Sequence, residues 1–187
     1  MRLKKNETIG ACGIDCGLCP RFYTKGDSRC PGCGGMNFKD KHPTCGVLTC
    51  CVIKNGFEVC AECKDFPCKR FDAEKEGYDS FVTHQKMFVN MKDIKENGME
   101  HFIRRQKIRM DILDDLLTHH DDGRAKSFFC QCCALLPIGK LQEIHHDVKG
   151  LDRQKELKER TGHIRKTLTK VAESEQIDLG LKKKTKK

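Results

Sequence analysis

Cysteine is the residue that most constrains how this chain can fold. Fourteen of its 187 residues are Cys, and eleven of these lie between Cys12 and Cys68. Such density is typical of secreted disulfide scaffolds or of reduced proteins whose thiolates bind metal ions. The opening MRLKKNETIGACGID has no apolar run long enough for a signal peptide, and no later stretch approaches the ~20 apolar residues of a membrane span. We therefore expect a cytoplasmic protein with reduced thiols and no membrane association.

The apolar content is low for a chain of this length. Hydrophobic residues make up 37% of the sequence and aromatic residues 6%, with no Trp. Residues 1–70 are rich in Gly, Pro, Asn and Asp, and they lack the sustained periodicity of a strand or a helix. We therefore expect bound metal ions to replace part of the missing core in this segment.

Helical periodicity begins at about Tyr78 and continues almost to the end of the chain. The predicted helices run from about Tyr78 to Asn97, from Met99 to Leu117, through the apolar segment SFFCQCCALLP, from Pro137 past Ile144, and from Asp152 to about Ala172. The predicted fold class is mostly α, with an irregular, metal-stabilised Cys-rich N-terminal part of small α+β or zinc-ribbon or knuckle-like elements. The expected domains are a Cys-rich metal-binding part over 1–72, a helical part packed against it over 73–175, and a basic disordered tail over 176–187.

The spacing of the N-terminal cysteines is typical of metal sites. The segment CGIDCGLCP is followed by CPGC, and the CxxC unit recurs at Cys60 and Cys63. Two residues between ligands let one tight turn direct both sulfurs at a single ion, which is why structural zinc sites reuse this unit. The sequence therefore predicts thiolate-bound metal.

An internal repeat adds a histidine to the candidate ligands. The pattern CxxCx4C that begins at Cys60 is preceded, eighteen residues earlier, by HxxCx4C beginning at His42. Because His commonly replaces Cys at zinc, His42 becomes a candidate. The eleven candidate metal ligands are Cys12, Cys16, Cys19, Cys30, Cys33, His42, Cys45, Cys50, Cys60, Cys63 and Cys68. Two tetrahedral ions need eight ligands and three need twelve, and adding Cys51 to the eleven candidates gives twelve. The sequence therefore leaves the number of ions open, and we favour about two Zn²⁺.

Iron is the alternative metal. The spacing CxxxCxxC at Cys12, Cys16 and Cys19 is also that of radical enzymes that use S-adenosylmethionine and hold a [4Fe–4S] cluster. Those enzymes need a large α/β barrel, whereas the rest of this chain is short and helical in pattern. Their usual aromatic residue before the last Cys is Leu18 here. A non-catalytic [4Fe–4S] cluster remains the alternative to zinc.

A second set of cysteines lies in the most apolar segment of the chain. Cys130, Cys132 and Cys133 are predicted to be buried in a helix, where free Cys often serves as a small apolar side chain. The pairs His119–His120 and His145–His146 flank this segment, so a further metal site there is an alternative. Adjacent His on a helix point in different directions, so at most one of each pair could reach a given ion.

With these residues in view, the chain resembles the prokaryotic cysteine-rich family catalogued as domain of unknown function 3795. The resemblance rests on CGIDCGLCP, CPGCGG, CAECKDFPCKRF, NMKDIKENGMEHFIRRQ and DGRAKSFFC, and so spans nearly the whole chain. Family members usually carry Cys at the position of His42, whereas Cys51, Cys132 and Cys133 are departures from the family pattern. The resemblance implies a metal-binding N-terminal part joined to a helical part in bacteria and archaea, and it implies no activity.

Three function classes follow from the ligand set. The favoured one is a metal-stabilised binding or adaptor module for an unknown protein partner, and the second is an iron–sulfur or metal-handling redox protein. A zinc enzyme is less expected, because catalytic sites usually combine His and carboxylates with few thiolates, and no catalytic residue is assigned. Binding to nucleic acid is a weaker alternative. The formal charge of +9 counts every Cys as neutral, and thiolates that bind metal would cancel much of it. The basic residues 104, 105, 107 and 109 fit the solvated face of a helix.

Overall fold

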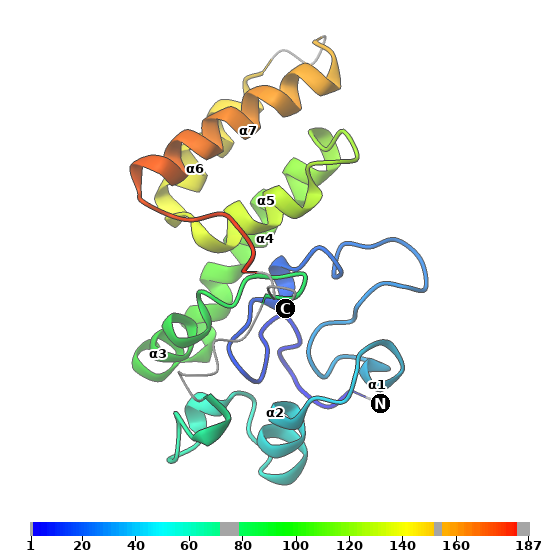
Figure 1. Ribbon diagram of the computed structural model, residues 1–187, viewed down its shortest axis with the longest axis vertical. Helices are drawn as coiled ribbons and strands as arrows, with labels where there is room; N and C mark the ends of the chain where they lie inside the picture. Colours follow the sequence, from blue (N-terminus) through cyan, green and yellow to red (C-terminus); the bar gives the residue numbers. More distant parts are fainter. Residues whose placement is uncertain (1, 72–78, 152–154, 183–187) are drawn as a thin grey trace, which may run out of the picture. The chain divides into compact units, whose positions relative to one another are not determined.

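The structure is a computed structural model that describes residues 2–71, 79–151 and 155–182 (Figure 1). The α-helices are α1 (Phe38–Lys41), α2 (Gly46–Leu48), α3 (Met87–Asn97), α4 (Met99–His119), α5 (Lys126–Leu135), α6 (Ile138–Lys149) and α7 (Leu157–Ser174). Short 3₁₀ turns cover Cys16–Leu18, Cys60–Glu62 and Lys69–Phe71, and a π-helical turn covers Thr49–Lys54. The mostly helical fold class is confirmed.

No strand occurs in the described ranges, so the expected α+β or ribbon elements are wrong. The backbone between the N-terminal cysteines instead closes on itself in tight turns. For example, the amide of Cys19 donates to the Cys16 carbonyl at 3.2 Å, and that of Cys63 donates to the Cys60 carbonyl at 3.0 Å. These backbone amides therefore bond within their own turns rather than in the ladder of a sheet.

The described chain forms two compact units. One contains the residues up to Arg104 together with Leu181 and Lys182, and the other contains Arg105–Gly180. The domain boundary expected at residues 72–73 lies outside the described residues, as do residues 183–187 of the expected tail. Residues 176–182 of that tail are described, and Lys182 exchanges backbone and side-chain hydrogen bonds of 2.8 and 2.9 Å with Asp79.

The first unit combines the Cys-rich segment with α3 and the first turn of α4. One apolar cluster joins Ile9 and Val59 of the Cys-rich segment to Met91, Ile94 and Phe102 of the helices. A second cluster lies within the Cys-rich segment and contains Ala11, Phe38, Leu48 and Cys51. The Cys-rich segment therefore shares a small core with α3 rather than folding around its cysteines alone.

Helix α3 begins later than predicted. The apolar pattern from Tyr78 predicted a helix through residues 79–86, but the helix starts at Met87. The Asp79 carboxylate accepts the amide hydrogen of His84 at 2.7 Å, and the Thr83 hydroxyl accepts that of Gln85 at 3.2 Å. Side chains that bond nearby backbone amides in this way compete with the helical ladder and hold the segment in turns.

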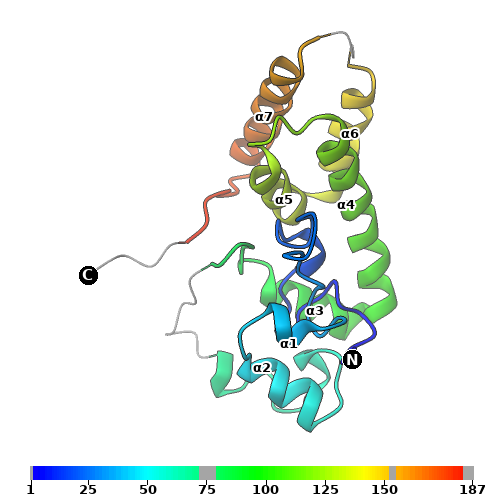
Figure 2. The same ribbon diagram turned by 90° about the vertical axis from the view of Figure 1, so that its right-hand side faces the viewer.

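The second unit is a helical bundle in which α5 and α6 pack on α7 (Figure 2). Its core includes Phe129, Leu136 and Ile164, none of which is measurably exposed. The predictions for α4, α5 and α6 are confirmed, because long apolar stripes and a proline stop define these helices well. Helix α7 begins at Leu157, and residues 152–154 of the predicted start lie outside the described residues.

The Arg109 side chain stabilises the C-terminal end of α5. It donates to the carbonyl oxygens of Cys133 and Leu136, at 2.6 and 2.8 Å. The last carbonyls of a helix have no partner in the helix itself, so this guanidinium satisfies groups that would otherwise be unpaired. No helix in the described ranges has the length and apolarity that crossing a membrane requires.

Candidate metal centres

All fourteen cysteines are free thiols, and the eleven in the N-terminal part fall into two groups. The first cysteine group consists of thiols that influence one another electrostatically: Cys12, Cys16, Cys19, Cys30, Cys33 and Cys45. The second cysteine group lines one cavity and consists of Cys50, Cys51, Cys60, Cys63 and Cys68. Every Cys among the candidate ligands belongs to one of these groups.

The turn CPGCGG presents Cys33 to the first group. The Cys33 amide donates to the Glu7 carbonyl at 2.8 Å, which pins the turn against the N-terminal segment. Gly32 has a φ of 82°, and a Cβ at that position would lie 2.3 Å from the Glu7 carbonyl oxygen. Only glycine fits such a left-handed, close-packed position. In return, the Cys33 sulfur accepts the amide hydrogen of Ala11 at 3.4 Å, as thiolate ligands commonly do.

The surroundings of the first group disfavour the charged form of its thiols. Burial, together with nearby Cys33 and Cys45, raises the pKa of Cys12 to about 12. Burial also raises the pKa of Cys16, with additional repulsion from Cys33, Cys12 and Cys19. Buried thiols this close together cannot ionise together in water-free surroundings unless a cation compensates them. Soft divalent metals compensate thiolates in this way, so the donor set fits such an ion.

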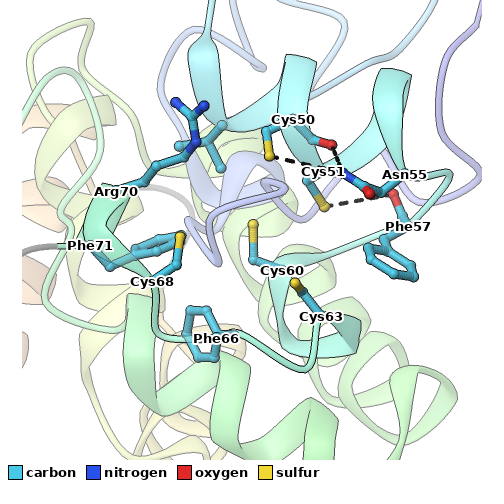
Figure 3. Close-up of a pocket in the computed structure, with 11 residues that line it drawn as sticks. Cys50, Cys51, Asn55, Phe57, Cys60, Cys63, Phe66, Cys68, Arg70 and Phe71 are labelled. Atoms are coloured by element: carbon cyan, nitrogen blue, oxygen red, sulfur yellow. Dashed lines mark hydrogen bonds between the residues drawn. The ribbon is translucent and has the colours of Figure 1, made fainter.

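The second group surrounds a cavity of about 40 Å³ (Figure 3). A cavity of 10–15 Å³ already holds a water molecule, so this one has room for an ion. Figure 3 shows the sulfurs of Cys60, Cys63 and Cys68 directed into the space below the π-helical turn that carries Cys50 and Cys51. The rest of the wall is largely apolar and includes Phe66 and Phe71, with Arg70 as the charged residue.

Hydrogen bonds already link the sulfurs of the second group to their surroundings. The Cys51 thiol donates to the Phe57 carbonyl oxygen at 3.7 Å, and the neighbouring Cys51 together with burial raises the pKa of Cys60. The amide nitrogen of the Asn55 side chain donates to the Cys50 carbonyl at 2.6 Å and lies 3.9 Å from the Cys50 sulfur. Such donors orient sulfur ligands and stabilise their negative charge.

Neither group has the closed geometry of a bound site. In the described part of the chain, which includes every Cys, no three His, Cys, Asp or Glu side chains are close enough to hold one metal ion. Zinc needs four sulfurs at ~2.3 Å from the ion, so binding requires side-chain rotation within each group.

The structure separates the residues of the internal repeat. Cys45 lies with the first group, whereas Cys50 lines the cavity of the second. His42 is exposed; its ring stacks on Phe38 with centroids 4.6 Å apart, and its Nδ1 contacts the Pro43 carbonyl oxygen at 3.0 Å. His42 is therefore the one candidate ligand that belongs to neither cysteine group as described here.

The C-terminal cysteines and histidines have structural surroundings. Cys130, Cys132 and Cys133 are buried in the bundle, which confirms their predicted place in an apolar helix. Asp115 accepts from His145 Nε2 at 3.0 Å and lies 3.1 Å from His119 Nδ1. The His145 contact joins α4 to α6, and the His119 contact lies within α4.

Several residues near the two cysteine groups could not be identified from any motif in the sequence. Lys4 is buried although it stands in the basic run RLKK, and Arg70 lines the second cavity although it follows the last CxxC motif. Asn90 of α3 donates to the Gly13 carbonyl and to the Asp15 carboxylate, both at 2.8 Å, and so ties α3 to the first cysteine loop. Only long-range packing identifies these residues, because none of them belongs to a spacing motif.

Comparison with known families gives one match. The family model described as "Protein of unknown function (DUF3795)" matches residues 8–73. The matched segment contains all eleven N-terminal Cys and confirms the family resemblance there. The motifs NMKDIKENGMEHFIRRQ and DGRAKSFFC lie outside it. Neither the search of curated proteins nor that of solved structures finds a match.

Proposed function

Residues 8–73 belong to the family of unknown function DUF3795, and we propose that this segment is a zinc-binding module with one ion in each cysteine group. The observation that carries the proposal is the division of eleven cysteines into two separate groups of six and five. Each group offers at least the four sulfurs that a tetrahedral ion needs. About two ions per chain then follow, with thiols left over.

The surroundings of the sulfurs favour a structural role for these ions. The cysteines of the first group are half-buried on tight backbone turns, and the cavity of the second group is lined by Phe57, Phe66 and Phe71. Sites made only of thiolates have low Lewis acidity and no open position for an activated water, so they stabilise folds rather than catalyse. A non-catalytic iron–sulfur cluster in one group is the second candidate, since four Cys also hold [4Fe–4S].

The biological role that we propose is that of an adaptor in the reducing cytoplasm, bound to a protein partner. Large apolar side chains are exposed in the first unit, with Phe81 59%, Phe88 50% and Val89 55% exposed. Neighbouring exposed apolar residues on one unit are typical of protein-binding surfaces. By contrast, Lys107 pairs with Asp111 at 2.9 Å and Arg109 caps α5, which leaves the predicted basic stripe less available to phosphates.

Matched removal of single thiols tests the proposal. We expect Cys33→Ala, in the first group, and Cys63→Ala, in the second, each to lose about one zinc ion per chain. Cys132→Ala removes a fully buried thiol from the second unit and should keep both ions. The readout is metal content by elemental analysis of protein purified without oxygen. Equal metal content in all three variants would refute the two-centre proposal.

A further inference from the structure

Lys4 is buried to an extent that is unusual for a lysine. Only 3% of its surface is exposed, and among the described residues no other Lys or Arg is buried. Lysine is almost never fully buried unless its charge is compensated. This residue therefore calls for a nearby negative charge.

The surrounding backbone fixes the Lys4 side chain in place. The amides of Leu3 and Lys4 donate to the Gly34 carbonyl at 2.7 and 3.3 Å. A Cβ at Gly34 would lie 2.9 Å from Lys4 Cγ, so the aliphatic part of the side chain packs directly against that glycine. At its far end, Nζ donates to the Ile9 carbonyl oxygen at 2.8 Å. Lys4 thus reaches from the CPGCGG turn to the segment before the first Cys.

That segment connects the two cysteine groups. The amide of Ala11 donates to the Cys33 sulfur at 3.4 Å, and the carbonyl of Ala11 accepts the amide hydrogen of Cys60 at 2.9 Å. Ile9, whose carbonyl accepts from the Lys4 ammonium, lies two residues before Ala11 in the sequence. The ammonium is therefore held against the segment that contacts both cysteine groups.

No carboxylate in the described chain forms an ion pair with Lys4 within 4.0 Å, and its ammonium donates to a backbone carbonyl instead. The half-buried Glu58 carboxylate already accepts the amide hydrogens of Lys5 and Asn6, at 2.7 and 3.0 Å. Neutral thiols supply no charge at all, so a buried ammonium among them would be strongly unfavourable.

We infer that Lys4 is a buried counter-cation shared by the two metal–thiolate centres, positioned by Ile9 and Gly34 so that one charge acts on both cysteine groups. This inference rests on the proposed function. Four thiolates around a divalent ion leave a net charge of about −2, and a fixed ammonium in the low-dielectric interior offsets part of it. Lys4 is a positioning residue for the ions, which it does not contact itself.

The test compares variants of the full chain in competition with a chromophoric zinc chelator. Lys4→Met removes the charge and keeps the apolar stem. Lys4→Gln also removes the charge but keeps a donor for the Ile9 carbonyl, and it decides the test if the Met variant does not fold. Lys5→Met removes a charge from the exposed neighbouring position and is the matched control.

We expect both Lys4 variants to bind zinc about tenfold more weakly or worse, and Lys5→Met to stay within about twofold of the wild type. Thermal unfolding of the zinc-loaded protein supplies a second readout, because both Lys4 variants should lower the melting temperature of the first unit and Lys5→Met should not. Zinc affinities equal to that of Lys5→Met, or a loss in Lys4→Met that Lys4→Gln restores, would overturn the inference. A wild-type protein that binds no zinc would instead refute the proposed function on which it rests.

Discussion

Removal of metal should unfold the first unit and spare the second. The apolar clusters of the first unit contain only six and four buried residues, and both include parts of the Cys-rich segment. A structural zinc ion contributes on the order of 10 kcal/mol of apparent folding free energy, whereas a whole domain is stable by only ~5–15 kcal/mol. Losing two ions therefore removes more free energy than this unit has in reserve.

The helices divide unequally between the units, so the change can be followed by circular dichroism. Helix α3, in the first unit, has 11 residues, whereas α5, α6 and α7 in the second have 10, 12 and 18. Addition of a chelator should therefore reduce the helical signal by well under half, and added zinc should restore it. Because Met91 and Ile94 share the core of the Cys-rich segment, α3 should be lost together with it.

Limited proteolysis with mass spectrometry locates the change along the chain. New cleavage sites should appear before Arg104 after chelation, while a fragment within Arg105–Gly180 should persist. Loss of the entire helical signal would show that the two units unfold as one, and an unchanged cleavage pattern would show that metal does not hold the first unit. Either result would refute the reasoning.

Substitutions at three residues test other parts of the account. His42→Cys and His42→Ala should have the same metal content and the same melting temperature, because the exposed ring stacks on Phe38; metal lost only in the Ala variant would instead make His42 a ligand. Arg109→Met should lower the free energy of unfolding of the second unit by about 1–3 kcal/mol in denaturant titrations, because two carbonyls at the end of α5 lose their donor, and an effect no larger than that of the exposed Lys107→Met would contradict this role. Partial burial tends to raise the pKa of Asp115, but the hydrogen bond and charge of His145 lower it overall. The ionised Asp115 therefore stabilises the fold at neutral pH, and this stabilisation is lost as the pH falls through the lowered pKa. The difference in melting temperature between the wild type and Asp115→Asn should therefore shrink from pH 7 to pH 3, and a difference that grows would contradict the assignment.

The sequence predicted those helices whose apolar pattern and stop residues lie within the helix itself or directly beside it. The stripe of α4 and the apolar run of α5 before Pro137 define these elements without reference to the rest of the chain. The start of α3 was missed because the side chains of Asp79 and Thr83 hold the preceding residues in turns. Apolar spacing alone does not reveal such competition between side chain and backbone.

The candidate site could be predicted only as a set of ligands. Spacing identified the cysteines, but the division into two groups depends on contacts between distant segments, such as that of Ala11 with Cys33. The repeat that made His42 a candidate is not preserved in space, since Cys45 and Cys50 fall into different groups. The burial of Lys4 follows from packing against Gly34 and leaves no trace in a basic N-terminal run.

The metal content of the wild-type protein tests the central claim most directly. The protein should be purified under reducing conditions without oxygen, then measured by elemental analysis and by its absorption spectrum. Two thiolate centres predict about two zinc ions per chain and no visible absorption band. Bound iron with a broad absorption band near ~400 nm would show an iron–sulfur cluster in place of the proposed zinc. A folded first unit without any bound metal would contradict the claim that metal holds this unit together.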